Sequence, residues 1–271
     1  MRGRSDNSIL LPIAIVAGFL VLWEAAIRLG DVKPYLLPAP SAIALRIVED
    51  WKLIFDNLEV TLTELLLGFT CAVIVAVVAG TAVAFSTLLR RAIYPLIVAS
   101  QTVPVIAIAP VLIIWFGYNI WPRVFVTALV AFFPLTVNVV AGFTSIEPEL
   151  IVFFRSLNAD RLALFFKLAL PSALPFIFAG MRITAVLAVI GATVSEWIGA
   201  DKGLGHLIAH DTAELDTVRV FACIVVLSAV GILLFTTVVV VEWIVLPWRH
   251  SPRKGWFWLR STHVVTSPAR A

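Results

Sequence analysis

Histidines and carboxylates near residue 210 are the residues of this chain whose spacing best suits metal chemistry. His206 and His210 are four residues apart, so on a helix they would share one face, with Asp211 or Glu214 beside them. Imidazole and carboxylate groups arranged in this way can hold a zinc ion, but the spacing fixes no third ligand. The pattern therefore favours a solvated loop, and we predict no metal site.

Nucleotide chemistry is not supported by the sequence. The motif G-x-x-x-x-G-K-[ST], whose backbone and lysine cradle phosphates, is absent. The glycine pair in 203–205 has no lysine and serine after it, so we predict an ordinary turn there. No nucleophile and base stand in a recognisable arrangement either, and we expect a protein that is not an enzyme.

Three glutamates lie inside strongly apolar runs: Glu64, Glu196 and Glu242. Ionisable groups at membrane depth are costly and commonly serve a function, such as a proton or ion path. Each of the three is also close enough to the end of its run for the side chain to reach the membrane interface. The sequence leaves both roles open.

Two prolines interrupt one apolar run, at Pro104 and Pro110. Each removes a backbone hydrogen bond, which a membrane tolerates where the segment packs against protein or lines a water-filled path. A kink for packing and a path-lining role are both consistent with this pattern. The polar and proline residues that could line a path are Gln101, Thr102, Pro104, Pro110, Thr184, Thr193 and Glu196.

The composition indicates whether these residues belong to a soluble protein or to a membrane protein. The chain has 271 residues, of which 61% are hydrophobic and 14% charged, and its mean hydropathy is +1.02. An ordinary soluble domain is about 45–50% apolar and about 25% charged. The charged residues are too few to cover so much apolar mass, which excludes a soluble enzyme, a disordered chain and a disulfide scaffold. We therefore predict an integral membrane protein.

Six apolar runs are long enough to cross a membrane as helices. They cover residues 9–27, 61–88, 93–115, 124–143, 175–198 and 218–245. Between the first two, Ser41 can cap a short amphipathic helix over 42–55, which we expect to lie along the interface. The prediction is an all-α integral membrane fold with about six transmembrane helices.

Lysine and arginine counts predict the orientation. With a cytoplasmic amino terminus, the inside segments hold twelve of these residues and the outside segments hold six. Cytoplasmic loops carry the excess of basic residues in membrane proteins. We therefore expect both termini in the cytoplasm.

The polar break at 144–171 is expected to form two short cytoplasmic helices. Pro148 suits a first helical turn, Asn158 breaks that helix, and Asp160 can cap a second one, which we expect to end before Pro171. Both helices carry many apolar side chains. The pair either connects two spans or presents a contact surface to a partner protein.

Several dispersed motifs appear in one order. They are LLPAPSAI at 36–43, QTVPVIAIAPVLIIWFG at 101–117, EPELIVFFRSLNADRLALFFKLALPSALPFIFAGMRI at 147–183 and GATVSEWIGADKGLGHLI at 191–208. With these motifs the chain resembles the permease subunits of binding-protein-dependent ABC importers, of the nitrate/sulfonate/taurine type. The resemblance covers about residues 36 to 245. It implies a type I importer permease fold in which the loop at 144–171 contains a coupling helix.

The resemblance also assigns coupling residues, although this chain departs from the family's pattern. The usual Glu-Ala-Ala triplet is Val152, Phe153 and Phe154, and the usual glycine is Asn158, which tolerates the left-handed backbone of a helix break. The substitutions change the surface that an ATPase would meet. The residues implied in coupling are Glu149, Val152, Phe153, Phe154, Arg155, Leu157, Asn158, Ala159 and Pro171.

The partners implied are a cytoplasmic ATPase dimer that binds ATP and Mg, an extracytoplasmic solute-binding protein, a second copy of this chain, and membrane lipid. Neither a cofactor in this chain nor nucleic acid is implied. The division is a first helix with an outer interfacial segment (1–56), a permease core (57–247) and a basic cytoplasmic tail (248–271). The solutes of such inner-membrane permeases include sulfonates, nitrate, bicarbonate and pyrimidine- or vitamin-type heterocycles. The alternative is an ion- or proton-coupled transporter or channel that uses the membrane glutamates.

Overall fold

The computed structural model describes residues 7–250 of the chain, and this part is all α-helical. The helices are α1 (Asn7–Leu29), α2 (Pro40–Glu49), α3 (Trp51–Phe85), α4 (Thr87–Ala92), α5 (Tyr94–Ser100), α6 (Val105–Phe116), α7 (Ile120–Thr144), α8 (Pro148–Ser156), α9 (Arg161–Leu164), α10 (Leu170–Gly199), α11 (Leu204–Ala213), α12 (Thr217–Val245) and α13 (Pro247–His250). A π-helical turn, Phe165–Ala169, joins α9 to α10.

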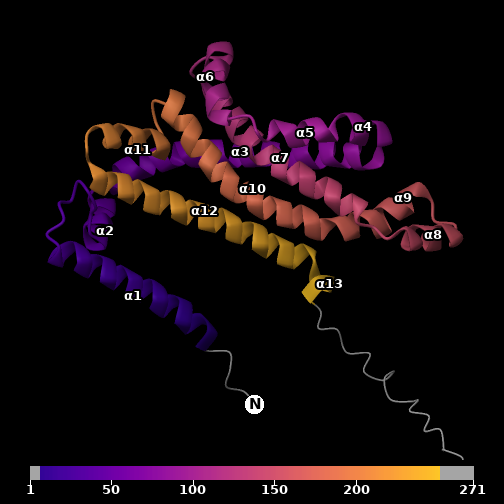
Figure 1. Cartoon of the computed structure of the whole chain (residues 1–271), viewed down its shortest axis with the longest axis horizontal. Coiled ribbons are helices and arrows are strands. Elements are labelled where there is room, and N and C mark those ends of the chain that lie inside the picture. Colours follow the sequence, from indigo (N-terminus) through magenta and orange to yellow (C-terminus); the bar gives the residue numbers. More distant parts are fainter. Residues whose placement is uncertain (1–6, 251–271) are drawn as a thin grey trace, which may run out of the picture.

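Five helices of the described chain are long and apolar enough to cross a membrane. They are α1, α3, α7, α12 and the continuous helix from Arg161 to Gly199 that contains α9 and α10. These helices run along the long axis of the molecule, with α2 and α11 at one end and α8 and α9 at the other (Figure 1). We call these the α11 end and the α8 end. The predicted membrane fold is confirmed.

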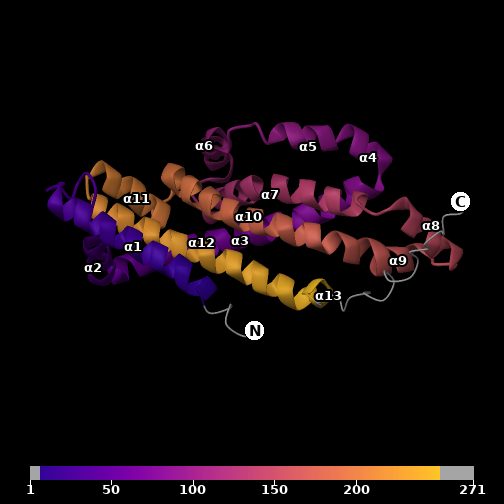
Figure 2. The same ribbon diagram turned by 60° about the horizontal axis from the view of Figure 1, so that its bottom comes forward.

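The predicted third span, 93–115, does not form one helix. It is divided into α5 and α6 by a non-helical stretch between Ser100 and Val105. Pro104 fixes its own backbone in an extended conformation and disfavours helix in the residue before it, which explains the break. Helices α4, α5 and α6 form an arch above α7 (Figure 2).

The segment predicted as one amphipathic helix over 42–55 is also divided. Helix α2 begins at Pro40, whose fixed φ suits a first helical position, so Ser41 is not the cap. Instead, the backbone N–H and the hydroxyl of Ser41 both donate to the carboxylate of Glu24 on α1, at 3.0 and 2.7 Å. Asp50 then separates α2 from α3, which begins ten residues before the predicted second span.

The second short helix of the 144–171 segment, which was expected to end before Pro171, continues without interruption into α10. A proline inside a helix removes one hydrogen bond and crowds the carbonyl four residues earlier, here that of Lys167. The π-helical turn at Phe165–Ala169 widens the backbone at this position. The turn lets the helix pass Pro171, so the chain does not restart at the membrane as predicted.

Small residues bring α3, α7 and α10 into close contact at the centre. Alanines are fully buried on all three helices, at Ala76, Ala131 and Ala188. A Cβ atom placed on Gly80 would lie 2.7 Å from the Cβ of Val139, and one on Gly142 would lie 3.0 Å from the carbonyl of Ala173. Close packing through small side chains stabilises helix association where the lipid offers no hydrophobic drive.

This packing predicts that Gly80→Ala lowers the thermal unfolding midpoint of the purified protein, because overpacking typically costs about 1–3 kcal/mol. Gly231→Ala on α12 is the matched control, since its Cβ would lie 3.5 Å from Val189, an ordinary contact distance. Fluorescence-monitored melting in detergent compares the two variants. Equal midpoints for both would contradict the proposed tight contact.

Candidate functional site

The α8 end carries the helix pair that the sequence predicts. Pro148 lies in the first turn of α8. Asn158 has a φ of 54°, in the left-handed region, and so interrupts the helical backbone between α8 and α9. Asp160 Oδ1 accepts a hydrogen bond of 2.8 Å from the N–H of Ala163 and so caps α9. The local structure of this segment is confirmed.

Apolar side chains are exposed on this pair, beyond the ends of the packed helices. Val152, Phe153 and Leu157 are 66%, 57% and 64% exposed. Phe154 is half-buried and lines a hollow of about 360 Å³ together with Leu157, Asn158, Ala159, Asp160, Ala163 and Lys167. Glu149 and Arg155 are exposed, whereas Pro171 lies apart from them in the first turn of α10. The pair therefore forms an apolar knob with a shallow hollow.

The seven path candidates do not converge on one site within a single chain. Gln101, Thr102, Pro104 and Pro110 are exposed on the arch of α5 and α6. The other three lie on α10 and differ from one another. Thr184 is buried and donates to the carbonyl of Ala131, Thr193 lines an apolar groove of about 470 Å³ between α10 and α12, and Glu196 is fully buried.

The three membrane glutamates do not extend to the interface; all are buried. Glu64 of α3 faces Arg123 of α7 at 3.0 Å between Oε1 and Nη1. Glu242 of α12 forms an ion pair with Arg182 of α10. The reading in which these side chains snorkel is therefore wrong, because partners on neighbouring helices hold them inside the protein.

The glycine pair at 203–205 is more than a turn, because its backbone amides hold the start of α11. Gly203 N–H donates to Asn57 Oδ1 at 2.8 Å, Leu204 N–H to Thr61 Oγ1 at 2.8 Å, and Gly205 N–H to Glu196 Oε2 at 2.5 Å. The first amides of a helix have no partner within it, and a carboxylate there is favourable. Sequence reasoning missed these contacts.

One signal could have pointed to them. Asn57, Thr61 and Glu64 lie at spacings of four and three residues, so they form a polar stripe on one face of the otherwise apolar helix α3. All three are buried. A buried polar stripe requires partners from another element. Its partners come from α7, from the loop after α10 and from the first residue of α11, which the sequence alone does not identify.

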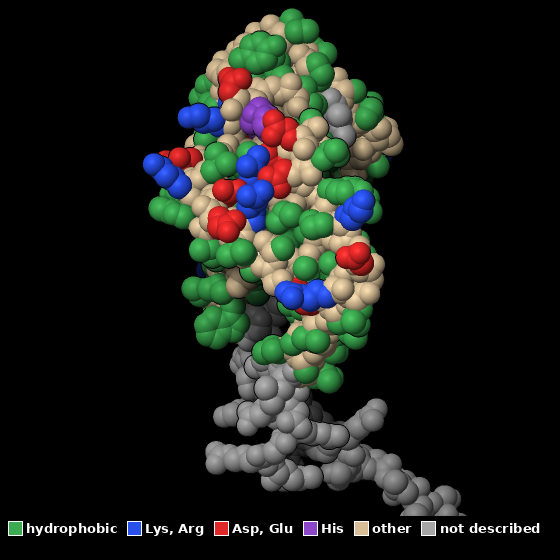
Figure 3. All heavy atoms as spheres, turned by 90° about the vertical axis from the view of Figure 1, so that its left-hand side faces the viewer, with side chains coloured by type: hydrophobic (Ala, Val, Ile, Leu, Met, Phe, Trp, Pro, Cys, Tyr) green, Lys and Arg blue, Asp and Glu red, His purple; other side chains and the backbone are tan. Residues whose placement is uncertain are grey.

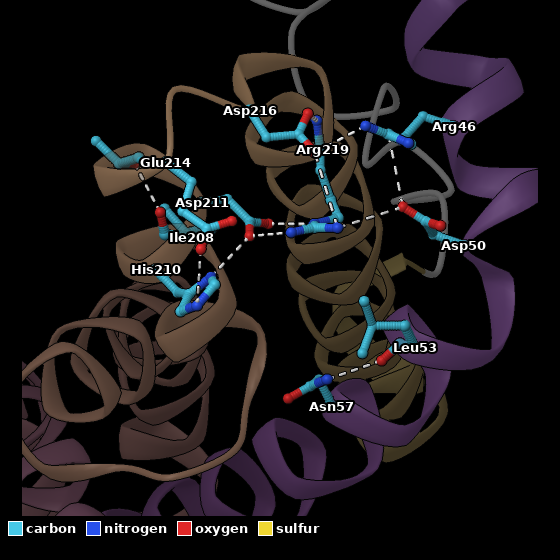
Figure 4. A network of polar contacts seen from close by, with 11 residues as sticks. Arg46, Asp50, Leu53, Asn57, Ile208, His210, Asp211, Glu214, Asp216 and Arg219 are labelled. Atoms are coloured by element: carbon cyan, nitrogen blue, oxygen red, sulfur yellow. Dashed lines mark hydrogen bonds and ion pairs between the residues drawn. The ribbon is translucent and has the colours of Figure 1, made fainter.

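A network of ion pairs joins α2, α11 and α12 at the α11 end (Figure 4). Arg219 Nε donates to the buried Asp211 at 2.6 Å, and Arg46 Nη2 donates to Asp216 at 2.7 Å. Asp50 lies between the two arginines, 3.5 Å from Arg46 Nε and 3.8 Å from Arg219 Nη1. Basic and acidic side chains are interspersed on this face (Figure 3). The network connects α2 and α11 to the first residues of α12.

One of the two histidines at this end, His210, contacts carboxylates through its ring. His210 Nδ1 lies 3.2 Å from Asp211 and His210 Nε2 lies 3.5 Å from Glu214. The rings of His206 and His210 have centroids 6.4 Å apart. Among the residues that the structure describes, no group of three or more His, Cys, Asp or Glu side chains could hold a metal ion.

The charge state of Asp216 follows from its contacts. Burial disfavours the ionised form, but hydrogen bonds from the Arg46 side chain and the Arg219 backbone outweigh this effect, and together they hold the pKa of Asp216 below its ordinary value of 3.8. The same hydrogen bond raises the pKa of the Arg46 guanidinium. The pair is therefore ionised at neutral pH.

Comparison with known proteins gives consistent matches. The family model "Binding-protein-dependent transport system inner membrane component" matches residues 68–245. The formylaminopyrimidine transport permease ThiX of Halalkalibacterium halodurans is 40% identical over 88% of this chain and 95% of its own length. The putative aliphatic sulfonates transport permease SsuC of Bacillus subtilis is 31% identical over 90% and 88%. A solved structure titled as an amino acid ABC transporter with histidines has a TM-score of 0.56, with 19% identity, over 75% of this chain and 97% of the other.

The Asp216 pair predicts a pH-dependent stability. Because the folded-state pKa is depressed, the stabilisation is present above the ordinary value of 3.8 and is lost as the pH falls through the lower folded value. Asp216→Asn should lower the unfolding midpoint at pH 7, and the difference from the unmodified protein should vanish in acid. Glu214→Gln, which alters an exposed carboxylate of the neighbouring helix end, should leave the midpoint unchanged. A difference for Asp216→Asn that is constant across the pH range would contradict the assignment.

Proposed function

The chain belongs to the family of binding-protein-dependent transport system inner membrane components, and we propose that it forms the path by which a small uncharged solute enters the cell. The resemblance found in the sequence and the permease fold expected from it are confirmed. The chain is the permease subunit of an ABC importer, a multi-pass protein of the inner membrane, and not itself an enzyme.

The knob at the α8 end is the surface that we assign to the ATPase. Phe153 and Leu157 are large apolar side chains exposed on short helices that project past the packed helices. Exposed apolar area on such a feature marks a contact with another protein. ATP and Mg would be bound by that partner, because this sequence has no phosphate-binding loop.

This assignment sets the orientation. With the α8 end in the cytoplasm, α1 begins on the cytoplasmic side and α12 ends there, so both termini are cytoplasmic. The count of lysines and arginines supports the same orientation. The α11 end, with its mixed charges and its ion-pair network, then faces outward and meets the solute-binding protein.

The path itself we place beside the arch of α5 and α6, between two copies of this chain. The backbone is not helical between Ser100 and Val105, and Gln101 and Thr102 are exposed there. Non-helical backbone at membrane depth requires either a protein partner or water. A second copy that covers the arch would supply both, since a path between the copies would hydrate the free carbonyls.

The solute class is inferred from charge. Arg123, Arg182 and Arg219 lie in helices that cross the membrane, and each faces a carboxylate of the same chain. These three arginines therefore offer no unpaired positive charge to a sulfonate, nitrate or bicarbonate. An uncharged heterocycle needs none, and the 40% identity to a formylaminopyrimidine permease supports this class.

Neither the charges nor the comparisons support the alternative, an ion- or proton-coupled transporter or channel. The membrane glutamates on which it depends are engaged with arginines or backbone amides. The comparisons match permeases of ABC transporters.

The ATPase assignment predicts that Phe153→Asp and Leu157→Asp each abolish co-purification with the cognate ATPase, because a carboxylate would be buried in an apolar contact. Leu215→Asp is the control: Leu215 is 70% exposed at the other end of the molecule, in a left-handed conformation that aspartate tolerates. Co-elution from detergent is the measurement. Retention of the ATPase by both knob variants would refute the assignment.

The solute assignment predicts ATP-dependent uptake of a labelled aminopyrimidine by proteoliposomes that contain this chain, its ATPase and its binding protein. Uptake of an alkyl sulfonate should stay at the level without ATP. Preferential uptake of the sulfonate would overturn the solute class and leave the ATPase assignment intact. Uptake driven by an ion gradient without ATP would overturn both.

A further inference from the structure

A buried polar cluster lies near the α11 end, where α3, α7 and α10 meet. Its members are Glu64, Arg123, Thr127 and Glu196. Glu64, Thr127 and Glu196 have no exposed surface, and the Arg123 side chain is 13% exposed. Glu64 forms an ion pair with Arg123, and the Glu196 carboxylate receives the amide of Gly205 and interacts electrostatically with Glu64.

Missing hydrogen-bond partners are concentrated in this cluster. In the described part of the chain, eight buried side-chain nitrogen or oxygen atoms lack such a partner, and five of them belong here. They are Glu64 Oε1, Glu64 Oε2, Arg123 Nε, Thr127 Oγ1 and Glu196 Oε1. Three of the five are carboxylate oxygens, which can only accept. The other two atoms, Arg123 Nε and the Thr127 hydroxyl, can donate but have no partner, and Glu64 Oε1 has only its ion-pair contact with Arg123. Native proteins satisfy nearly all buried polar atoms, so these three carboxylate oxygens need a further hydrogen.

The charges of the cluster do not balance. Two carboxylates, Glu64 and Glu196, face a single guanidinium, that of Arg123. The donors that reach Glu196 are neutral: the Thr61 hydroxyl of α3 and, from α11, the backbone amides of Gly205 and the partly exposed His206. The carboxylate farther along α11, Asp211, is matched by Arg219. Fully ionised, the cluster would carry one negative charge opposed only by neutral donors and the partial positive charge of the α11 N-terminus, and a buried group in that position takes up a proton instead.

The surroundings favour a proton over a metal ion. A Cβ on Gly203 would lie 2.4 Å from the Glu196 carboxyl carbon, and one on Gly68 would lie 2.5 Å from Thr127 Cγ2, so backbone closes tightly around the cluster. A sodium ion needs several oxygen ligands and would be repelled by the guanidinium 3.0 Å from Glu64. A proton needs no space beyond one O–H bond.

We propose that Glu64 and Glu196 together hold one proton in the resting protein, so that one carboxylic acid and one Arg123–carboxylate pair form a neutral cluster. The proton comes from water and forms a single O–H bond, which supplies the donor that the carboxylate oxygens lack. It belongs to the pair and not to either residue. This inference does not depend on the solute or the partners proposed above.

The test is infrared spectroscopy of the full chain in lipid nanodiscs at pH 7, using the C=O stretch of a protonated carboxylic acid that shifts in D2O. The band should be present in the unmodified protein. It should disappear in Glu64→Gln and equally in Glu196→Gln, because either variant leaves one carboxylate balanced by Arg123. Glu59→Gln, an exposed glutamate of the same helix, should keep the band.

A thermal midpoint for each variant separates loss of the proton from loss of the fold. Each single glutamine variant should melt within a few degrees of the unmodified protein. The double variant, which carries both Glu64→Gln and Glu196→Gln, should melt at a lower temperature because Arg123 loses both partners. Spectra that are the same for the unmodified protein and for folded Glu64→Gln and Glu196→Gln would overturn the proposal. Loss of the band in only one of the two would overturn the shared proton.

Discussion

Water is absent from the middle of a membrane, so the charged side chains that this chain carries into it must find partners inside the protein. That constraint organises the helix packing. Glu64 with Arg123 joins α3 to α7, and Glu242 with Arg182 joins α12 to α10. At the α11 end, outside the spans, Asp211 with Arg219 joins α11 to α12 in the same way. Removing every partner of such a buried charge leaves it uncompensated, which costs more than the pair contributes. The pairs therefore fix which helices are neighbours, and the small residues set how closely they approach.

The same constraint explains how the short helices α2 and α11 are attached to the membrane helices. Helices α2 and α11 each follow a helix that crosses the membrane, and in each case a glutamate near the end of that helix binds the first amides of the next one. Glu24 binds Ser41 at the start of α2, and Glu196 binds Gly205 at the start of α11. A carboxylate is stabilised at a helix N-terminus, and the free amides are satisfied by it. The two short helices are thus anchored to the membrane helices and not merely linked by loops.

The features that follow from local chemistry could be predicted from the sequence, and those that depend on distant partners could not. Hydropathy identifies the long helices, and proline and aspartate signals locate α8 and α9 correctly. The partner of Glu64 lies on another helix, which no local pattern identifies. The continuity of α10 past Pro171 depends on a π-helical turn that has no sequence signature here. Tertiary contacts also turned the 203–205 segment from a predicted turn into the anchor of α11.

The helix from Arg161 to Gly199 connects these features mechanically. It begins at the knob, passes through the π-helical turn, packs against α7 and α12, and ends at the Glu196 contact with α11. A helix is stiff along its axis, so the two ends of this element cannot move independently unless it bends, and the π-helical turn is the irregular point at which bending costs least. If the knob is the seat of the ATPase, displacement there reaches the outer face through one covalently continuous element. An interruption at Pro171, as predicted from the sequence, would have separated the two ends, whereas the continuous helix connects the knob to the Glu196 contact with α11.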